Sequence, residues 1–275
     1  MLITLKQMKK LHDIQFEMFQ ELKRVLETLD IPYFFVHGSL LSAVTTHEFI
    51  AEDDDIDIAV FRDGYNRLME KGNDIVSSKY CFQWSGNDDF PLSFAKFRKN
   101  GTEFCQPVLE KYQCHKGIYI DIFPIDYVPE KESVAFRAKK RLLEARINSR
   151  LNSPKSWKSR CVIAVSIFAH PSYHRAIKAR EALYSSCCSS DYVAIFGGKK
   201  AERRMLRNWF GKGTTAFFCG MEVNCPVDHD AYLTRIYGPN YREKNPAEDR
   251  ITEDRNIEVS ASYIDFGNGE IIGQK

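Results

Sequence analysis

The chain has 275 residues, and its 39 basic and 37 acidic side chains leave a formal net charge of only +2. This balance excludes a strong overall field that would attract nucleic acid, so no nucleic-acid partner is expected. The length is large for one simple domain and suits a catalytic core with an insertion.

No apolar run in the sequence has membrane-spanning length. The longest, Cys161 to Ala169, is far shorter than the about 20 residues that a spanning helix needs. Residues Met1 to Lys10 lack the apolar stretch of a secretory signal. We therefore expect a cytoplasmic protein whose eight cysteines are reduced rather than paired in disulfides.

The first predicted element is a helix from Leu5 to Leu29. Its apolar residues recur at steps of three and four, which is the spacing of one helix face, and Pro32 follows its end. We interpret residues 1–30 as an N-terminal helix packed on the core.

A buried strand, a turn and a short helix are predicted next. The apolar residues Ile31 to His37 are typical of a strand, and Gly38 allows a sharp turn and the close approach of a phosphate. Ser39 is predicted to N-cap a helix ending at Thr46 and to offer its hydroxyl to that phosphate.

The acidic run Asp53 to Asp57 is the most informative stretch of the chain, because it leads directly into a predicted strand that ends at Phe61. Side chains alternate between the faces of a strand, so Asp53, Asp55 and Asp57 are expected on one face. Carboxylates held this close repel one another unless a cation lies between them. Hard divalent cations such as Mg²⁺ take such oxygen ligands. A polar strand end or a helix N-cap is the alternative interpretation.

Further strands complete the predicted core, residues 31–130. A helix from Arg62 to Met69 precedes strands over residues 80–84 and 94–98, and the mixture of strands and helices indicates an α/β core around a mixed sheet. Lys96 and Arg98 share one face of the second of these strands. They are predicted to bind a diphosphate if this strand lies beside the acidic one. A solvent-facing basic pair on an edge strand is the alternative.

Asp121 interrupts the strongly apolar strand predicted from Ile118 to Phe123. A buried unpaired charge is expensive, so Asp121 needs a partner, and a metal held by Asp55 and Asp57 supplies one. Asp126 follows Pro124, and we expect it to be a turn or cap residue.

Residues 131–210 are predicted to form a basic helical segment. Between Arg137 and Arg180, twelve basic residues, Lys155 among them, are opposed only by Glu144, and Trp157 lies within the same stretch. Such a segment is typical of a surface for an anionic membrane or a phosphorylated acceptor. A basic lid packed over the core is the alternative.

Residues 211–275 are predicted to return to the core. Short strands are expected over residues 214–218 and 221–223, followed by a helix from Asp228, its N-cap, to Tyr237. The tail from Pro246 is acidic and forms either a flexible arm or a surface strand through residues 261–266.

Three blocks of the sequence together resemble the LicD family. The first is HGSLLSAVTTHEFIAEDDDIDIAVFRDGYNRLM (His37 to Met69), whose strand, Gly-Ser, helix and Asp-x-Asp order is the general pattern of the nucleotidyltransferase superfamily. The second is GIYIDIFPIDYVP, from Gly117 to Pro129, and the third is YLTRIYGPNY, from Tyr232 to Tyr241. The chain departs from the usual family pattern at Ser42, Thr45 and Ala51-Glu52, none of which is a predicted ligand.

The resemblance implies a fold and a set of site residues. The fold is α/β, with a nucleotidyltransferase-like mixed β-sheet core flanked by helices and a helical basic insertion. Asp121 would be the third carboxylate of a triad with Asp55 and Asp57, either completing the metal site or acting as the base. Asp53 is a fourth candidate ligand. The predicted donor-phosphate residues are Gly38, Ser39, Lys96 and Arg98.

The resemblance also implies an activity. Family members transfer phosphocholine, or a related phosphoalcohol, from a CDP-linked donor to a glycan and release CMP. We therefore expect Mg²⁺, with Mn²⁺ as the alternative, CDP-choline as donor, and as acceptor a bacterial surface glycan precursor, free or lipid-linked. Peripheral contact with the anionic inner face of the plasma membrane is also expected. CDP-ethanolamine, CDP-glycerol or CDP-ribitol as donor, nucleotidyl transfer, and a non-catalytic membrane-associated scaffold are the alternatives.

Overall fold

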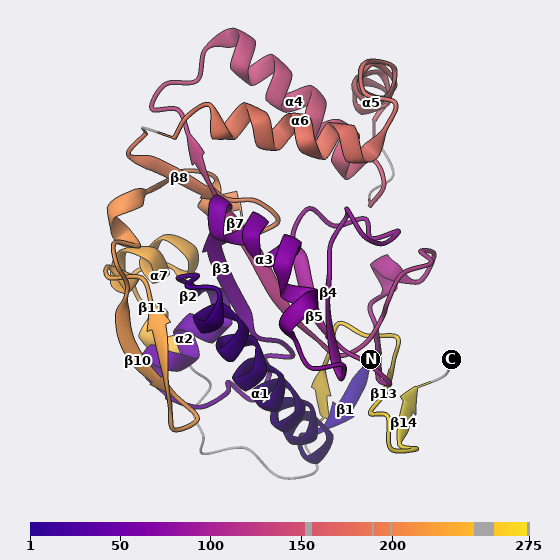
Figure 1. Cartoon of the computed structure of the whole chain (residues 1–275), viewed down its shortest axis with the longest axis vertical. Helices are drawn as coiled ribbons and strands as arrows, with labels where there is room; N and C mark the ends of the chain where they lie inside the picture. The colour runs from indigo at the N-terminus through magenta and orange to yellow at the C-terminus, as the bar shows by residue number, and fades with distance from the viewer. Residues whose placement is uncertain (152–155, 189, 199, 245–255, 274–275) are drawn as a thin grey trace.

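The computed structural model describes residues 1–151, 156–188, 190–198, 200–244 and 256–273, and it has a mixed sheet with helices packed against it (Figure 1). Among these residues, seven strands form the central sheet, in the order β2-β3-β7-β5-β4, with β8 and β9 continuing from β7. Only β3 and β7 of these strands pair in parallel. The predicted α/β fold with a mixed sheet is confirmed.

The strands of the central sheet are β2 (Phe34–Phe35), β3 (Asp57–Phe61), β4 (Tyr80–Gln83), β5 (Ala95–Lys99), β7 (Tyr119–Val128), β8 (Tyr192–Ile195) and β9 (Met205–Leu206). The helices are α1 (Leu5–Thr28), α2 (His37–Thr45), α3 (Arg62–Ile75), α4 (Val134–Asn148), α5 (Trp157–Ala169), α6 (Tyr173–Ser185) and α7 (His229–Tyr237). Short 3-10 turns include η2 (Lys200–Arg203) and η3 (Arg207–Trp209).

Small sheets join segments that are distant in the sequence. Strand β1 (Leu2–Thr4) pairs with β12 (Asn256–Glu258), and β6 (Glu103–Cys105) pairs with β13 (Tyr263–Asp265), which also pairs with β14 (Ile271–Gly273). Strands β10 (Thr214–Phe218) and β11 (Met221–Cys225) form a hairpin beside β2. The predicted C-terminal strands are therefore present, whereas residues 245–255 of the acidic tail lie outside the described residues.

Helix α1 forms because its first turn is capped and one of its faces is apolar. Thr4 accepts a hydrogen bond from the Gln7 backbone, and the Gln7 side chain reaches back to the Thr4 backbone, which makes a capping box. The apolar face, from Met8 to Leu26, is buried in the core. Helices α1 and α3 lie in front of the sheet in Figure 1, and both contact β7.

The segment after β7 forms the upper layer of Figure 1. Its helices α4, α5 and α6 pack together, and the chain then returns to the sheet as β8. The predicted segment 131–210 therefore contains strands as well as helices. In the described residues, none of the helices is both long and apolar enough to cross a bilayer. All eight cysteines, each of which is described, are free thiols.

The prediction that Asp126 is a turn or cap residue is wrong. Strand β7 continues through Pro124 to Val128, and Asp126 is only 1% exposed within it. Pro124 is tolerated because the ladder with β5 ends at Ile122 and the ladder with β8 begins at Ile125. Arg62 Nε and Nη2 each donate to the Asp126 carboxylate over 2.7 Å, which compensates its charge.

Arg62 also links the core to the helical layer, because its Nη1 donates to Glu181 of α6 over 3.2 Å. We expect Asp126→Asn to lower the free energy of unfolding by about 3–5 kcal/mol, since it leaves a buried guanidinium with one partner fewer. The double variant Arg62→Met/Asp126→Leu should recover most of this loss. Chemical denaturation measures both.

Asp230→Asn is the matched control, because Asp230 pairs with Arg242 at an exposed site and should cost less than about 1 kcal/mol. Equal losses for Asp126→Asn and Asp230→Asn would contradict the structural role of the buried pair.

Candidate active site

Three carboxylates converge at the start of the parallel strand pair. One oxygen each from Asp55, Asp57 and Asp121 lies within 4.8 Å of the others. Asp57 is the first residue of β3 and stands opposite Asp121 in the ladder with β7, while Asp55 lies in the loop just before β3. The structure thus brings the three predicted ligands together. Burial raises the pKa of Asp55 well above its usual value, and the charges of Asp57 and Asp121 raise it further.

Lys96 is the first cation paired with this cluster. It stands opposite Asp121 on β5, is 1% exposed, and donates to Asp121 Oδ1. Its Nζ also lies 3.3 Å from the centroid of the Tyr119 ring. Burial raises the pKa of Asp121 to about 6 even though Lys96 opposes the rise.

His37 is the second cation, and sequence analysis missed it. Its Nδ1 lies 3.1 Å from Asp57 Oδ2, and its Nε2 lies 2.7 Å from Glu202 Oε2. Burial lowers the pKa of His37, but the two carboxylates outweigh this effect and raise it to about 10. The imidazole is therefore charged near neutral pH and donates from both nitrogens.

The cluster fits a divalent cation with oxygen ligands. When all of them are ionised, the three aspartates and Glu202 carry four negative charges, and Lys96 and His37 compensate two of them. Two negative charges remain, which is the balance that Mg²⁺ or Mn²⁺ neutralises, and carboxylate oxygens are the ligands such cations prefer.

The acidic loop before β3 is held through hydrogen bonds to its backbone carbonyls. The prediction of one strand face carrying Asp53, Asp55 and Asp57 is wrong, because β3 begins only at Asp57. Two buried polar residues of α1 bind this loop: His12 Nε2 donates to the Asp53 carbonyl over 2.7 Å, and Gln15 donates to the Asp54 carbonyl over 2.8 Å. These bonds replace the ladder that a strand would have provided.

The Gly-Ser turn also differs from expectation. A Cβ on Gly38 would lie 2.0 Å from Asp53 Oδ2, so the Asp53 carboxylate takes the space that was assigned to a phosphate. Helix α2 begins before Ser39, with Val36 as its N-cap, so the predicted Ser39 N-cap is wrong. The Ser39 hydroxyl instead accepts a hydrogen bond from the Asp57 N–H over 2.8 Å and positions the start of β3.

Arg98 does not accompany Lys96 at the carboxylates. It is fully buried, where its Nε donates to Gln83 Oε1 over 2.8 Å and its Nη1 donates to the Gly117 carbonyl over 2.7 Å. The structure therefore brings one of the two predicted cations into contact with the cluster. Binding of a donor phosphate by any of the four predicted residues stays a prediction.

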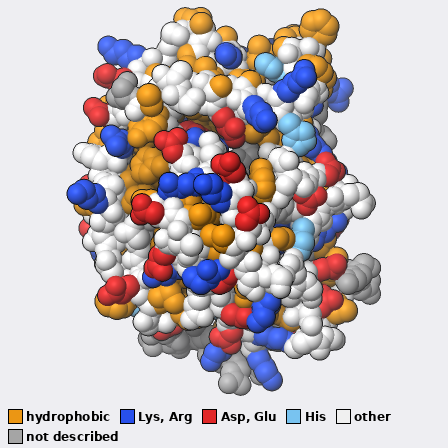
Figure 2. All heavy atoms as spheres, viewed as in Figure 1, with side chains coloured by type: hydrophobic (Ala, Val, Ile, Leu, Met, Phe, Trp, Pro, Cys, Tyr) orange, Lys and Arg blue, Asp and Glu red, His pale blue; other side chains and the backbone are white. Residues whose placement is uncertain are grey.

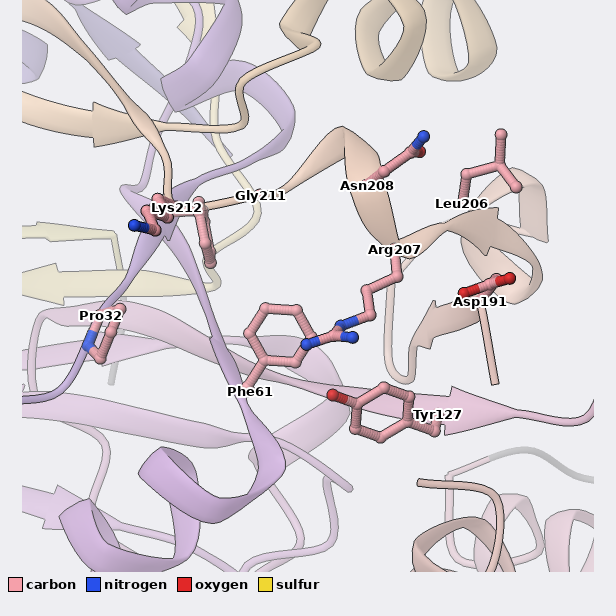
Figure 3. Close-up of a pocket in the computed structure, with 10 residues that line it drawn as sticks. Pro32, Phe61, Tyr127, Asp191, Leu206, Arg207, Asn208, Gly211 and Lys212 are labelled. Carbon is pink, nitrogen blue, oxygen red and sulfur yellow. The ribbon is translucent and has the colours of Figure 1, made fainter. Parts of the chain in front are cut away.

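A pocket of about 840 Å³ lies farther along the same sheet face (Figure 3). Phe61 and Tyr127, at the ends of β3 and β7, line it, and Figure 3 shows the Arg207 guanidinium beside their rings. Its guanidinium carbon lies 5.6 Å from the Tyr127 ring centroid. Lys212 and Asp191 are further polar residues of the lining.

Comparison with protein-family models gives a match over residues 30–142, to the family described as LicD/FKTN/FKRP, nucleotidyltransferase domain. Within these residues the chain carries a LicD domain. A search of curated proteins gave no match. The LicD domain contains all three clustered aspartates, Lys96 and His37, whereas Glu202 is supplied from beyond the matched residues. The resemblance found in the sequence is thus confirmed.

The residues that sequence analysis missed share a reason for being missed. His12 and Gln15 occur within an amphipathic helix pattern, and Glu202 is separated from His37 by 165 residues. The sequence offered one signal for His37, which directly precedes Gly38. The structure adds a second, because its φ of +50° is unusual for a residue other than glycine. Such strain is typical of functional positions.

His12 provides a test of how the acidic loop is held. Burial lowers its pKa to about 4, so it stays neutral and stacked on Phe49 while an unfolded chain takes up a proton near pH 6.5. The folded state therefore loses stability as the pH falls from 6.5 to 4, by up to about 3 kcal/mol.

We expect this loss to be absent in His12→Gln, which keeps a side-chain donor for Asp53 but does not titrate. The measurement is the free energy of unfolding of both proteins at pH 7, 5.5 and 4. A wild-type minus variant difference that does not change with pH would contradict the role given to His12.

Proposed function

We propose that this LicD-domain protein transfers phosphocholine, or a related phosphoalcohol, from a CDP-linked donor to a hydroxyl of a bacterial cell-surface glycan precursor. The observation that carries the proposal is the cluster of Asp55, Asp57 and Asp121 inside the LicD domain, with its two excess negative charges. A site of this charge supports binding of a cation together with a diphosphate, rather than of a phosphate alone.

The residues of the cluster have distinct roles in this proposal. Asp55, Asp57 and Asp121 would hold Mg²⁺, with Mn²⁺ as the alternative, which when bound supplies charge neutralisation at the donor phosphates. His37 orients Asp57 by donating from its Nδ1 to Asp57 Oδ2, and Glu202 accepts from Nε2 on the other side of the imidazole. Lys96 positions the Asp121 carboxylate in the same way.

The proposed reaction is an in-line displacement at phosphorus. The acceptor oxygen forms a bond to the phosphorus of the phosphocholine group, the bond from that phosphorus to the bridging oxygen breaks, and CMP leaves with the electron pair. The acceptor proton passes to Asp121 if that residue acts as the base rather than only as a ligand.

The pocket beside Phe61 and Tyr127 supports an extended acceptor. Phe61 follows Asp57 by four residues on one strand face, which corresponds to about 13 Å. A glycan seated on these half-buried rings, with an anionic group near Arg207 and Lys212, would reach the cluster only if it is longer than one sugar. We assign the acceptor to this pocket.

The proposal predicts metal-dependent binding of a CDP-alcohol. Isothermal titration calorimetry with Mg²⁺ should show binding of CDP-choline, tested beside CDP-ethanolamine, CDP-glycerol, CDP-ribitol and CTP. Asp55→Asn/Asp57→Asn should abolish this binding, and CMP release in the presence of acceptor should fall by roughly 10²–10³-fold or more, because the charge that retains the cation is lost.

Asp74→Asn is the matched control, since Asp74 is exposed on α3, and it should bind like the wild type. Preference for another CDP-alcohol would keep the mechanism and change the product. Binding of CTP alone would indicate nucleotidyl transfer instead, and binding of none of these ligands would sink the enzyme proposal.

A further inference from the structure

A second pocket, of about 230 Å³, lies between the central sheet and the helical layer. Its lining includes Phe94 from the core, Glu144 from α4, Arg180 from α6, and Gly197, Gly198 and Arg203 from the segment around η2. The lining thus includes two arginines and one glutamate, an excess of positive charge, and of the arginines Arg180 is buried and Arg203 is exposed.

Arg180 is the unusual member of this lining. It is 3% exposed, yet no carboxylate in the described part of the chain lies within ion-pair distance of it. Its Nη2 reaches the Ser93 carbonyl over 3.4 Å, the guanidinium lies 5.4 Å from the Phe196 ring, and the buried Nε has no hydrogen-bond partner among the described residues. Arg62, by contrast, has Asp126 as a bidentate partner.

A buried guanidinium without an anion is costly to keep. The cost is explained if an anion from outside the chain completes the site, because Nε and Nη of one arginine present parallel donors that match two oxygens of a phosphate.

The pocket adjoins the carboxylate cluster. A Cβ on Gly198 would lie 3.1 Å from His37 Nε2, so the backbone at Gly198 lies directly against the imidazole. On another side, the Phe94 ring packs against Phe123 at a tilt of 34°, with centroids 4.5 Å apart, and lies 5.5 Å from Lys96 Nζ. A ligand that occupies the pocket is thus separated from the cluster by single side chains.

We propose that this pocket is a phosphoryl-binding subsite in which Arg180 and Arg203 hold a phosphate ester or diphosphate of a substrate. The inference rests on the proposed function, since the carboxylate cluster next to it would carry out the transfer. The phosphoryl group comes either from the nucleotide donor or from a phosphorylated acceptor, and the chemistry of recognition is the same for both.

The test compares Arg180→Gln with the wild type. Inorganic pyrophosphate, CDP and a hexose 1-phosphate are titrated by calorimetry, and the melting temperature is recorded with and without each ligand. We expect affinity for at least one of them to fall by about 10- to 100-fold, since charge-assisted hydrogen bonds are lost. The ligand-free variant should melt no lower than the wild type, because an unpaired buried charge has been removed.

Arg175→Gln, at an exposed position of the same helix, is the matched control and should change neither quantity. Weaker binding of CDP assigns the subsite to the donor, and weaker binding of the hexose phosphate alone assigns it to the acceptor. Unchanged affinity for all three ligands, or a lowered melting temperature with unchanged affinity, overturns the subsite. If pyrophosphate binding depends on Arg180 but the wild-type protein releases no CMP from a CDP-alcohol, the proposed function is contradicted and this inference stands.

Helix α5 carries an independent observation. Five exposed apolar or small residues at steps of four, three, one and three form a stripe along one face: Trp157, Cys161, Ala164, Val165 and Phe168. Ile167 and Ala169 are exposed on either side of it. Trp157 is 71% exposed and Phe168 is 92% exposed. Ser166, on the opposite face, is buried, where α5 packs on α4. The outward face of this helix is thus its apolar face, the reverse of an ordinary surface helix.

Basic residues flank this outward stripe. At 100° per residue, Lys158 lies on one side of it and Arg160 on the other, and both are exposed. Arg137, Lys139 and Arg141 are exposed on the neighbouring α4, and the upper edge of Figure 2 shows hydrophobic and basic side chains together. Lys155 lies outside the described residues.

We infer that α5 docks on an anionic bilayer surface, with the stripe in the interface and the flanking cations at the lipid phosphates. The experiment is sedimentation with vesicles of phosphatidylcholine, with and without phosphatidylglycerol. Trp157→Ser/Phe168→Ser should weaken binding to the anionic vesicles by about tenfold or more. Phe217→Ser, at another exposed aromatic, is the control.

Binding that needs phosphatidylglycerol and fails only in the α5 variant supports the inference. Equal binding by both variants overturns it. So does a wild-type dimer in analytical ultracentrifugation that dissociates in the α5 variant without any vesicle binding, because a second copy would then cover the stripe.

Discussion

Asp57 and Asp121 stand opposite each other on adjacent parallel strands, and the repulsion between their carboxylates is the constraint on which the rest of the site depends. Each is compensated by a different part of the chain: Lys96 comes from the next strand, and His37 from the first residue of α2. Glu202 then fixes His37 from a segment outside the LicD domain. The charge that remains on the cluster is what makes a divalent cation its natural partner.

The loop that carries Asp55 shows how the fold keeps a charged segment in place. His12 and Gln15 bind its carbonyls rather than its carboxylates, so the side chain of Asp55 stays available to the cluster. Ser260 holds the exposed end differently, by donating its N–H and hydroxyl to the Asp54 carboxylate. The acidic run thus divides into residues that stabilise the loop and residues that form the site.

Two arginines lie between the helical layer and the core, one with carboxylate partners and one without a carboxylate partner among the described residues. Arg62 of the core is satisfied by Asp126 and reaches Glu181 of α6, which anchors the layer. Arg180 of α6 points back toward the core and lacks such a carboxylate among the described residues. Arg62 holds the layer in place, and Arg180 leaves a positive group in the pocket that adjoins the carboxylate cluster. The outward stripe of α5 belongs to the same layer, because α5 packs on α4, which also lines the proposed subsite.

The sequence by itself determined the α/β class, the N-terminal helix and the aspartates of the cluster, because these follow from local periodicity and from carboxylates in apolar surroundings. Its resemblance to the LicD family rests instead on the motif blocks, and the match over residues 30–142 supports it. It misjudged Asp126 and Ser39, since a carboxylate after proline reads as a turn and a serine after glycine reads as a cap. Asp126 pairs with Arg62, and Ser39 accepts from the Asp57 N–H. Both partners are distant in the sequence and come close only in the folded chain. Only the tertiary structure decided which cations meet the cluster, because Lys96 and His37, and the Glu202 that holds His37, come from three separate elements. Their pairing depends on strand register and helix packing, which no local pattern encodes.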